Sequence, residues 1–434
     1  MMAEAVLIGD LERWRECRDC GLFQRLPAIP AGEAAICARC DALLRRAAPA
    51  AIHLARINTV TASILFVLAL SLPLVDLNVL GRFSSATVFS GPDMLRDRGL
   101  PALGLVVLAT LIVMPAVKLA LDLMVFFGVC ARRPPAWLPW LFGWRDHVSP
   151  WAMVEVFLLG SFVAYTRLKA LAHVHVGAAA LALGGVMLCI VATDATLDRE
   201  AIWRALHAKR PHSAPERPRP SPLPQEGRTA QLIGCDECAF VDHATEGERC
   251  GRCRHRLSVR KGGTDRVWAL LLAAGLLYIP ANVLPVMTVE RLGKGGPTTI
   301  VNGVIDLARS HMWPLAVLVL LASLVVPVFK LLSVAAMLLM TRRRSAWQLR
   351  GRTRWFRLVK AIGRWSMIDI FAMAVLVGVV RFGAIATVLP GLGAGAFCTV
   401  VLLTMAATEM FDPRLMWDAA GLAERAFERT GSRR

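Results

Sequence analysis

Eight long apolar runs divide this chain of 434 residues, and polar or basic segments separate them. Each run is close to the roughly 20 residues that a membrane-spanning helix needs. The pattern predicts an all-α polytopic membrane protein whose spans fall into two sets of four. The predicted spans cover residues 57–80, 100–130, 151–165, 171–191, 267–289, 313–340, 365–389 and 392–410.

The second set of four spans repeats the first. Pro115 and Lys118 interrupt the second span, and Pro327 and Lys330 interrupt the sixth span 212 positions later. Other landmarks recur after 214 positions: Trp151, Met153, Glu155, Phe157, Asp198 and Trp203 match Trp365, Met367, Asp369, Phe371, Asp412 and Trp417. The chain therefore contains two copies of one four-helix module. In each copy the proline should bend the helix, and the lysine places a charge where a charge is expensive.

Composition agrees with a membrane protein and narrows the classes of partner that the chain is expected to bind. Hydrophobic residues make up 56% of the chain, and the formal net charge is +18. A basic excess is typical of nucleic-acid binding or of the inner side of a membrane, and the long apolar runs favour the membrane. Two tyrosines and 7% aromatic residues also argue against a base-stacking surface. We therefore expect no nucleic-acid partner.

Cysteine spacing predicts two metal sites. Eight of the 11 cysteines form four Cys-x-x-Cys pairs, and these are Cys17, Cys20, Cys37 and Cys40 in one segment and Cys235, Cys238, Cys250 and Cys253 in another. Paired knuckles at this spacing are typical of zinc ribbons in a reducing compartment. Four thiolates leave no open coordination position, so we expect two structural zinc ions. A rubredoxin-like iron site uses the same four sulfurs and stays an alternative.

These patterns divide the chain into six parts. Each zinc ribbon precedes a membrane module, and a Pro- and Arg-rich segment between the halves reads as a disordered linker. The predicted parts are ribbon 1 (1–50), membrane module 1 (51–203), the linker (204–230), ribbon 2 (231–262), membrane module 2 (263–417) and a tail (418–434).

Charge predicts the orientation of the spans. Residues 341–364, between the sixth and seventh spans, contain eight arginines and one lysine, whereas residues 81–99 and 290–311 carry three basic residues each. Arginine-rich segments stay in the cytoplasm. Both termini, the linker and both ribbons should lie on the same side, which agrees with the reducing compartment that the cysteines indicate.

Buried charges are the candidates for a polar site in the membrane. Lys118 and Glu155, and their counterparts Lys330 and Asp369, are placed so that each pair could meet. Asp122 offers Lys118 a second, local partner that Lys330 lacks. The full candidate set is Lys330, Asp369, Ser366, Thr404, Lys118, Asp122 and Glu155. The pairs could be structural, could bind a lipid head group or a proton for transport, or could belong to a hydrolytic or transferase site. No nucleophile–base constellation is visible, so we expect no enzyme and no catalytic residues.

Three motifs resemble the paraquat-inducible protein A family. They are Trp365-Ser366-Met367-Ile368-Asp369-Ile370-Phe371, Pro327-x-x-Lys330-Leu331 and Phe411-Asp412-Pro413-Arg414-Leu415-x-Trp417. The layout of ribbons before two four-helix modules is also similar, and the resemblance covers nearly the whole chain. In the first half Asp198-Arg199-Glu200 replaces Asp-Pro-Arg. Because the second module keeps the fuller motif, we expect Lys330 and Asp369 to matter more than Lys118 and Glu155.

The resemblance implies an inner-membrane protein of a Gram-negative bacterium that works beside MCE-domain proteins. Such a protein would pass phospholipid to or from its partner, between the inner and outer membranes. The residues alone support membrane transport or a membrane scaffold, and the lipid comes from the resemblance. A non-transporting scaffold and a metal- or redox-responsive sensor stay open as alternatives.

Overall fold

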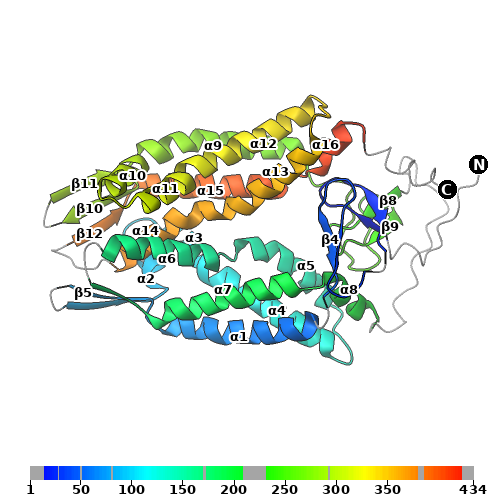
Figure 1. Cartoon of the computed structure of the whole chain (residues 1–434), viewed down its shortest axis with the longest axis horizontal. Coiled ribbons are helices and arrows are strands. Elements are labelled where there is room, and N and C mark those ends of the chain that lie inside the picture. Colours follow the sequence, from blue (N-terminus) through cyan, green and yellow to red (C-terminus); the bar gives the residue numbers. More distant parts are fainter. Residues whose placement is uncertain are drawn as a thin grey trace, which may run out of the picture.

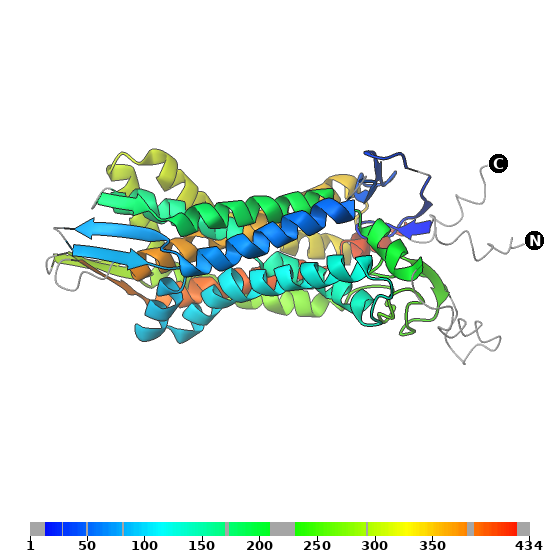
Figure 2. The same ribbon diagram turned by 90° about the horizontal axis from the view of Figure 1, so that it is seen from below.

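The structure is a computed structural model that describes residues 14–27, 29–48, 51–79, 82–169, 173–208, 231–291, 294–379 and 386–422. The molecule is elongated, and its long helices run along the long axis (Figure 1). The two cysteine-rich ribbons lie at one extremity and small β-sheets lie at the other, as the perpendicular view also shows (Figure 2). We call these the ribbon end and the sheet end.

Among the described residues, eight helical segments are long and apolar enough to cross a membrane, as predicted. Four belong to each half of the chain. Those of module 1 are α1 (Ala51–Ser71), the series α3 (Pro101–Leu108), η2 (Ala109–Val113) and α4 (Met114–Cys130), the series α5 (Leu138–Val148), η3 (Ser149–Trp151) and α6 (Val154–Lys169), and α7 (Ala178–Thr196). Those of module 2 are α9 (Thr264–Val283), the series α11 (Trp313–Leu320), η4 (Leu321–Val325) and α12 (Val326–Arg342), the series α13 (Leu349–Ile362), η5 (Gly363–Met367) and α14 (Ile368–Val379), and α15 (Leu392–Met410).

The prolines predicted to bend the second and sixth spans lie just after a π-helical turn. Pro115 follows η2 and Pro327 follows η4, so the device is repeated in both modules. Proline has no N–H to donate to the preceding turn, and a wider turn accommodates the lost bond. In module 1 the carbonyl of Thr110, inside η2, accepts a hydrogen bond from the backbone N–H of Met153 on the neighbouring span at 3.3 Å.

The third and seventh spans begin earlier than predicted. Their first parts, α5 and α13, cover the tryptophan-rich and arginine-rich segments that the sequence suggested were connections. The charges of α13 misled the prediction because most of them lie away from its buried face, with Arg352 as the buried exception. Arg350 and Arg354 are exposed while Phe356 and Val359 are buried, as an amphipathic helix requires.

The distal ends of several predicted spans are strands instead of helix, which the all-α expectation missed. Each module carries a three-stranded antiparallel sheet at the sheet end, with the order β6-β5-β7 in module 1 and β11-β10-β12 in module 2. The strands are β5 (Val75–Val79), β6 (Arg82–Ala86), β7 (His173–Val176), β10 (Met287–Arg291), β11 (Lys294–Thr298) and β12 (Ala386–Pro390). In the first sheet Val75 lies opposite both Ala86 and Val176. A short apolar run fits a strand as well as a helix end, so hydropathy alone could not separate them.

Short elements complete the fold. Two amphipathic helices, α2 (Ser90–Asp97) and α10 (Ile300–Arg309), follow the first hairpin of each module, and α8 (Arg199–Ala208) and α16 (Arg414–Ala419) close the modules at the ribbon end. The ribbons contribute the hairpins β1 (Trp14–Glu16) with β2 (Phe23–Arg25), β3 (Ala34–Ile36) with β4 (Leu43–Arg46), and β8 (Gln231–Gly234) with β9 (Val241–Ala244). The linker predicted for 204–230 begins inside α8. Residues 209–230 and most of the predicted tail lie outside the described residues.

The two modules share one apolar core, which centres on α14. Glycines let α14 pack closely against module 1. An added Cβ at Gly160 of α6 would lie 2.9 Å from the carbonyl oxygen of Ile368, and one at Gly91 of α2 would lie 2.8 Å from that of Ala374. The repeat is not symmetric here. Gly303, the counterpart of Gly91, has no atom within 4 Å of such a Cβ among the described residues.

Candidate functional site: two metal centres and a buried lysine

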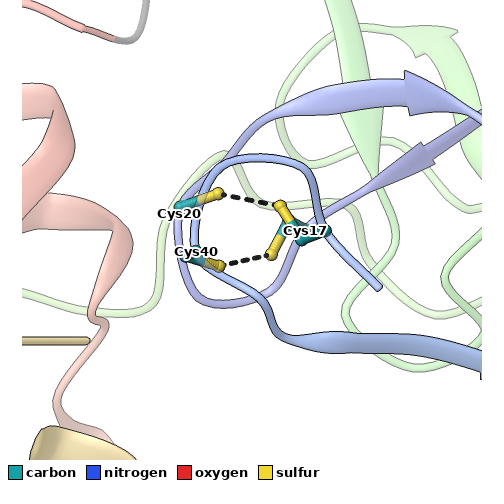
Figure 3. A group of neighbouring side chains, drawn as sticks. Cys17, Cys20 and Cys40 are labelled. Atoms are coloured by element: carbon teal, nitrogen blue, oxygen red, sulfur yellow. Dashed lines mark hydrogen bonds between the residues drawn. The ribbon is translucent and has the colours of Figure 1, made fainter. Parts of the chain in front are cut away.

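Four cysteine sulfurs converge in each ribbon. Cys17, Cys20 and Cys40 point toward one another in ribbon 1 (Figure 3), and all four sulfurs of each set lie within 4.8 Å of one another. The nearest sulfurs are 3.5 Å apart between Cys17 and Cys40 and 3.5 Å apart between Cys235 and Cys253. Bonds of about 2.3 Å to one tetrahedral ion place its sulfurs about 3.8 Å apart. Both sets could therefore hold a single ion each.

Each Cys-x-x-Cys knuckle is closed by a residue with left-handed backbone. Gly21, Asp41, Ala239 and Arg254 follow the second cysteine of the four knuckles and have φ between 55° and 69°. In each knuckle the N–H of this residue donates to the carbonyl of the first cysteine, at 2.8 to 3.0 Å. Backbone N–H groups of Arg39 and Arg252 also point at the sulfurs of Cys37 and Cys250, at 3.4 Å. The backbone thus orients the thiolates before an ion binds.

A closed ionic network holds the lysine of module 1. Lys118 is 2% exposed, and its Nζ donates to Asp194 Oδ2 at 2.7 Å. Arg145 Nε donates to Asp122 Oδ1 at 2.5 Å, and the same guanidinium also bonds Asp194. Lys118 and Arg145 therefore neutralise Asp122 and Asp194, and Asp146 lies 3.7 Å from the Arg145 guanidinium. The sequence suggested Glu155 or Asp122 as the partner of Lys118, and the structure pairs Lys118 with Asp194 instead.

The lysine of module 2 has no such network. Lys330 is 1% exposed, and among the described residues its Nζ has no hydrogen-bond partner, so the pairing with Asp369 that the sequence suggested is not formed. The lysine end packs against Gly363, where an added Cβ would lie 2.9 Å from Nζ. Glu409 is nearby on α15, but its Oε2 bonds Lys360 Nζ at 2.7 Å. A buried amine is therefore left with unused hydrogen-bonding capacity.

Two of the predicted polar residues, Ser366 and Thr404, lie on elements that pack against the helix of Lys330. Ser366 lies three residues after Gly363 in the 3₁₀ turn η5, and side chains at this spacing share a face. Ser366 Oγ is buried and also lacks a hydrogen-bond partner within the described part of the chain. Thr404 is buried on α15, which packs against both η5 and α12, and its hydroxyl donates to the carbonyl of Val401 at 2.9 Å. Asp369 lies in the first turn of α14, half-buried.

Glu155 connects the modules instead of pairing within its own. Its carboxylate accepts a hydrogen bond from Arg364 at 3.2 Å, and Arg364 belongs to η5 of module 2. The sequence indicated neither this contact nor the role of Arg145. Arg145 lies among tryptophans in a segment read as a connection, and only the helical state of α5 reveals that it reaches the span interior.

The fold and these sites define a class: a multi-pass membrane protein of two repeated four-helix modules, each preceded by a four-cysteine ribbon that can hold a metal ion. The chain belongs to the paraquat-inducible protein A family, whose pattern matches residues 55–207 and 264–421. The two matched segments correspond to the two membrane modules and leave out both ribbons. The resemblance drawn from the motifs is therefore confirmed.

Curated relatives match over nearly the full length. The chain is 31% identical over 420 residues to intermembrane transport protein PqiA of Escherichia coli K12, covering 93% of this chain and 95% of the relative. It is 28% identical over 412 residues to lipophilic envelope-spanning tunnel protein A of the same organism, covering 95% and 92%. A probable intermembrane transport protein of Haemophilus influenzae is 24% identical over 413 residues. These relatives are named as transport proteins and not as enzymes. No solved structure matches the chain.

Proposed function

We propose that this chain is an inner-membrane component of a lipid transport system, and that module 2 carries the site through which lipid passes. It would hand phospholipid to, or take it from, a periplasmic partner of the MCE-domain class. The names of the relatives, which refer to intermembrane transport and to an envelope-spanning tunnel, support the transport role.

The difference between the two lysines carries this proposal. Lys118 and Lys330 occupy the same repeat position, yet the acids that neutralise the first are absent from the second. Asp122 corresponds to Val334 after 212 positions, and Asp194 corresponds to Thr408 after 214 positions. The network is thus complete in module 1 and open in module 2.

An open network is costly unless it serves a ligand. A charge buried in a membrane span without a partner is strongly unfavourable. A phosphate entering beside Lys330 would supply the missing charge and accept hydrogen bonds from Nζ and from Ser366 Oγ. Lys330 is 12 residues before the end of its helix at Arg342, so the phosphate would sit about 18 Å from that end.

We also propose the identity of the metal ions, the orientation in the membrane and the division of the chain into parts. We propose zinc as the ion of both ribbons, since four closed thiolate sites without an open position are typical of structural zinc. The ribbon end would face the cytoplasm, because residues 341–364 with their eight arginines lie there. We also propose the six-part division of the chain, with the start of the linker moved from 204 to 209 because α8 extends to Ala208.

The test compares Lys330→Met with Lys118→Met, which remove the same charge from the same repeat position. Membrane abundance and thermal stability are measured beside the amount of phospholipid that co-purifies with the chain and beside complementation of a deletion strain. We expect Lys330→Met to keep normal abundance and stability and to lose bound phospholipid and activity. Lys118→Met should lose stability, because the buried Asp122 and its neighbour Asp194 then share the single cation Arg145.

Abundance and phospholipid content together complete the test. If Lys330 were only structural, Lys330→Met would lose abundance while each folded chain kept its phospholipid, and the assignment of the site would be wrong. Normal phospholipid content in Lys330→Met would contradict the phosphate contact. Co-purification of a kinase or regulator in place of an MCE-domain protein would favour the sensor alternative.

A further inference from the structure

The two ribbons pack against the membrane modules in a crossed arrangement. The cysteines of ribbon 1 share an apolar cluster with α9, α12, α13 and α16 of module 2. The cysteines of ribbon 2 share one with α4, α5 and α8 of module 1. Each ribbon therefore buries its apolar side on the module that it does not directly precede.

One acid of module 1, Glu200 of α8, contacts both ribbons, while Asp198 contacts ribbon 1 alone through Arg45. Arg15 of ribbon 1 pairs with the Glu200 carboxylate at 2.7 Å. Arg252 of ribbon 2 binds the same carboxylate through two hydrogen bonds, at 3.1 and 2.9 Å. Arg15 and Arg252 are 6% and 8% exposed, so this three-way junction is shielded from solvent.

One base of module 2, Arg414 of α16, contacts both ribbons, beside contacts of α13 with ribbon 1 and of Asp418 with Arg260 of ribbon 2. The Arg414 guanidinium donates to Glu16 of ribbon 1 at 3.2 Å and to Asp236 of ribbon 2 at 3.0 Å. Asp412, two residues before, holds the same guanidinium at 2.9 Å. Arg414 is 2% exposed.

The two junctions are repeat counterparts with opposite charge. Glu200 and Arg414 lie 214 positions apart, which is the spacing that also relates Asp198 to Asp412 and Trp203 to Trp417. The sequence alone suggested that Asp198-Arg199-Glu200 was a degraded copy of Asp412-Pro413-Arg414. The structure shows instead that Glu200 contacts both ribbons, as Arg414 does, with the opposite charge.

The ribbon residues that contact these two anchors carry the opposite charges. Arg15 and Glu16 are consecutive residues of strand β1, so their side chains point to opposite sides. One side meets the acid of module 1 and the other meets the base of module 2. Exchanging the two modules would set Arg15 against Arg414 and Glu16 against Glu200.

Burial and charge act on these groups in opposite directions. Burial would raise the pKa of Glu200, but the hydrogen bonds and charges of Arg252 and Arg15 outweigh it and hold the pKa below its usual range. Burial would likewise lower the pKa of Arg414, and the bonds to Asp412 with the nearby carboxylates raise it instead. Both anchors therefore stay charged at neutral pH.

The metal ligands lie next to every ribbon residue in the two junctions. Arg15 and Glu16 precede Cys17, Asp236 follows Cys235, and Arg252 precedes Cys253. Folding of each knuckle around its ion therefore positions the charges that reach the modules.

We propose that the two ribbons together couple the membrane modules at the ribbon end. The oppositely charged anchors Glu200 and Arg414 fix how the ribbons are seated on the modules, and the bound metal ions keep the ribbons folded in that position. The coupling joins the ribbon ends of the two modules in one orientation. It does not depend on which lipid the protein carries, so it stands apart from the proposed transport site.

Charge reversal tests the role of Glu200 in the intact, metal-loaded protein. Glu200→Arg should raise amide hydrogen exchange in β1, β9 and α8 at least about tenfold, because three buried cations then face one another. Glu200→Arg/Arg15→Glu/Arg252→Glu restores opposite charges and should bring exchange back toward that of the unaltered chain. The control is Arg342→Glu, which reverses the exposed pair with Asp265 and should change nothing there.

Metal removal supplies a second readout that needs no substitution. Treatment with a chelator should raise exchange in α8 and α16, which contain no metal ligand, along with the ribbons. If exchange rises in the ribbons while α8 and α16 stay protected, the ribbons do not couple the modules. Failure of the triple variant to recover protection, with both metals still bound, would show that the charges do not set the seating.

Discussion

Phe157 in α6 and Phe371 in α14 are repeat counterparts, and their rings meet edge to face with centroids 5.7 Å apart at 83°. A residue touches its own counterpart only near the axis that relates two copies. This pair therefore marks an approximate two-fold axis that runs between the modules, along the spans. Both modules begin at the ribbon end, so they form a parallel repeat of the kind known in transporters.

The aromatic pair on the axis should stabilise the contact between modules. Phe371→Ala removes a fully buried ring and should cost about 3 to 5 kcal/mol. A double-mutant cycle with Phe157→Ala should give a coupling of about 0.5 to 1.5 kcal/mol for the edge-to-face contact. Thermal unfolding in detergent measures both quantities. Phe162→Ala, at a ring that is 57% exposed, is the control and should have little effect.

Alanine substitution of two counterpart glycines should have opposite effects. A Cβ at Gly91 meets the backbone of α14 at 2.8 Å, whereas one at Gly303 meets no described atom within 4 Å. Gly91→Ala should therefore destabilise the protein by about 1 to 3 kcal/mol through overpacking. Gly303→Ala should stabilise helix α10 by about 0.5 to 1 kcal/mol. Equal shifts in melting temperature would contradict the asymmetric packing of α2 and α10.

The ionic network of module 1 should be essential for folding. Arg145→Met leaves Asp122 and Asp194 facing each other near Lys118 alone, and we expect a loss of about 3 to 5 kcal/mol. Membrane abundance and the melting temperature report this loss. Arg145→Met/Asp122→Asn should recover part of it, because the surplus buried charge is gone. A stable single variant would mean that the short contacts of Arg145 contribute little.

The two ribbons should bind one metal ion each. We expect two zinc ions per chain in a colourless protein by elemental analysis. Cys250→Ser should lower the folded yield and leave one ion, while Cys130→Ser, at an exposed cysteine outside both sets, should keep two. Iron together with a reversible redox couple would overturn the zinc assignment and favour the sensor alternative.

Orientation in the membrane can be tested with introduced cysteines. A cysteine at Gly295, in β11 at the sheet end, should react with an impermeant maleimide added to cells with a permeabilised outer membrane. One at Ser345, which lies between α12 and α13, should not. The unaltered chain, with its own exposed Cys130, sets the background. The reverse labelling pattern would contradict the orientation inferred from the arginines.

The sequence predicted the repeat, the eight spans and the cysteine clusters, because each depends on spacing along the chain. It predicted charge partners poorly. Lys118 finds Asp194 on a helix 76 positions away, and that acid looked like an ordinary hydrated residue at a helix end. Glu200 looked like a lost motif because its partners come from both ribbons. Contacts of this kind depend on how distant helices pack, which hydropathy does not encode.

Glu16 and Arg414 are separated by 398 positions, almost the full length of the chain. At about 5 to 20 residues per second, synthesis of the intervening chain takes roughly 20 to 80 s. During that time the spans can enter the bilayer before Arg414, the partner of Glu16, has been made. A chain that stops before α16 lacks Arg414, so Glu16 keeps Arg260 as a partner but loses its link to module 2. The contact between β1 and α16 can therefore form only after most of the chain has been made.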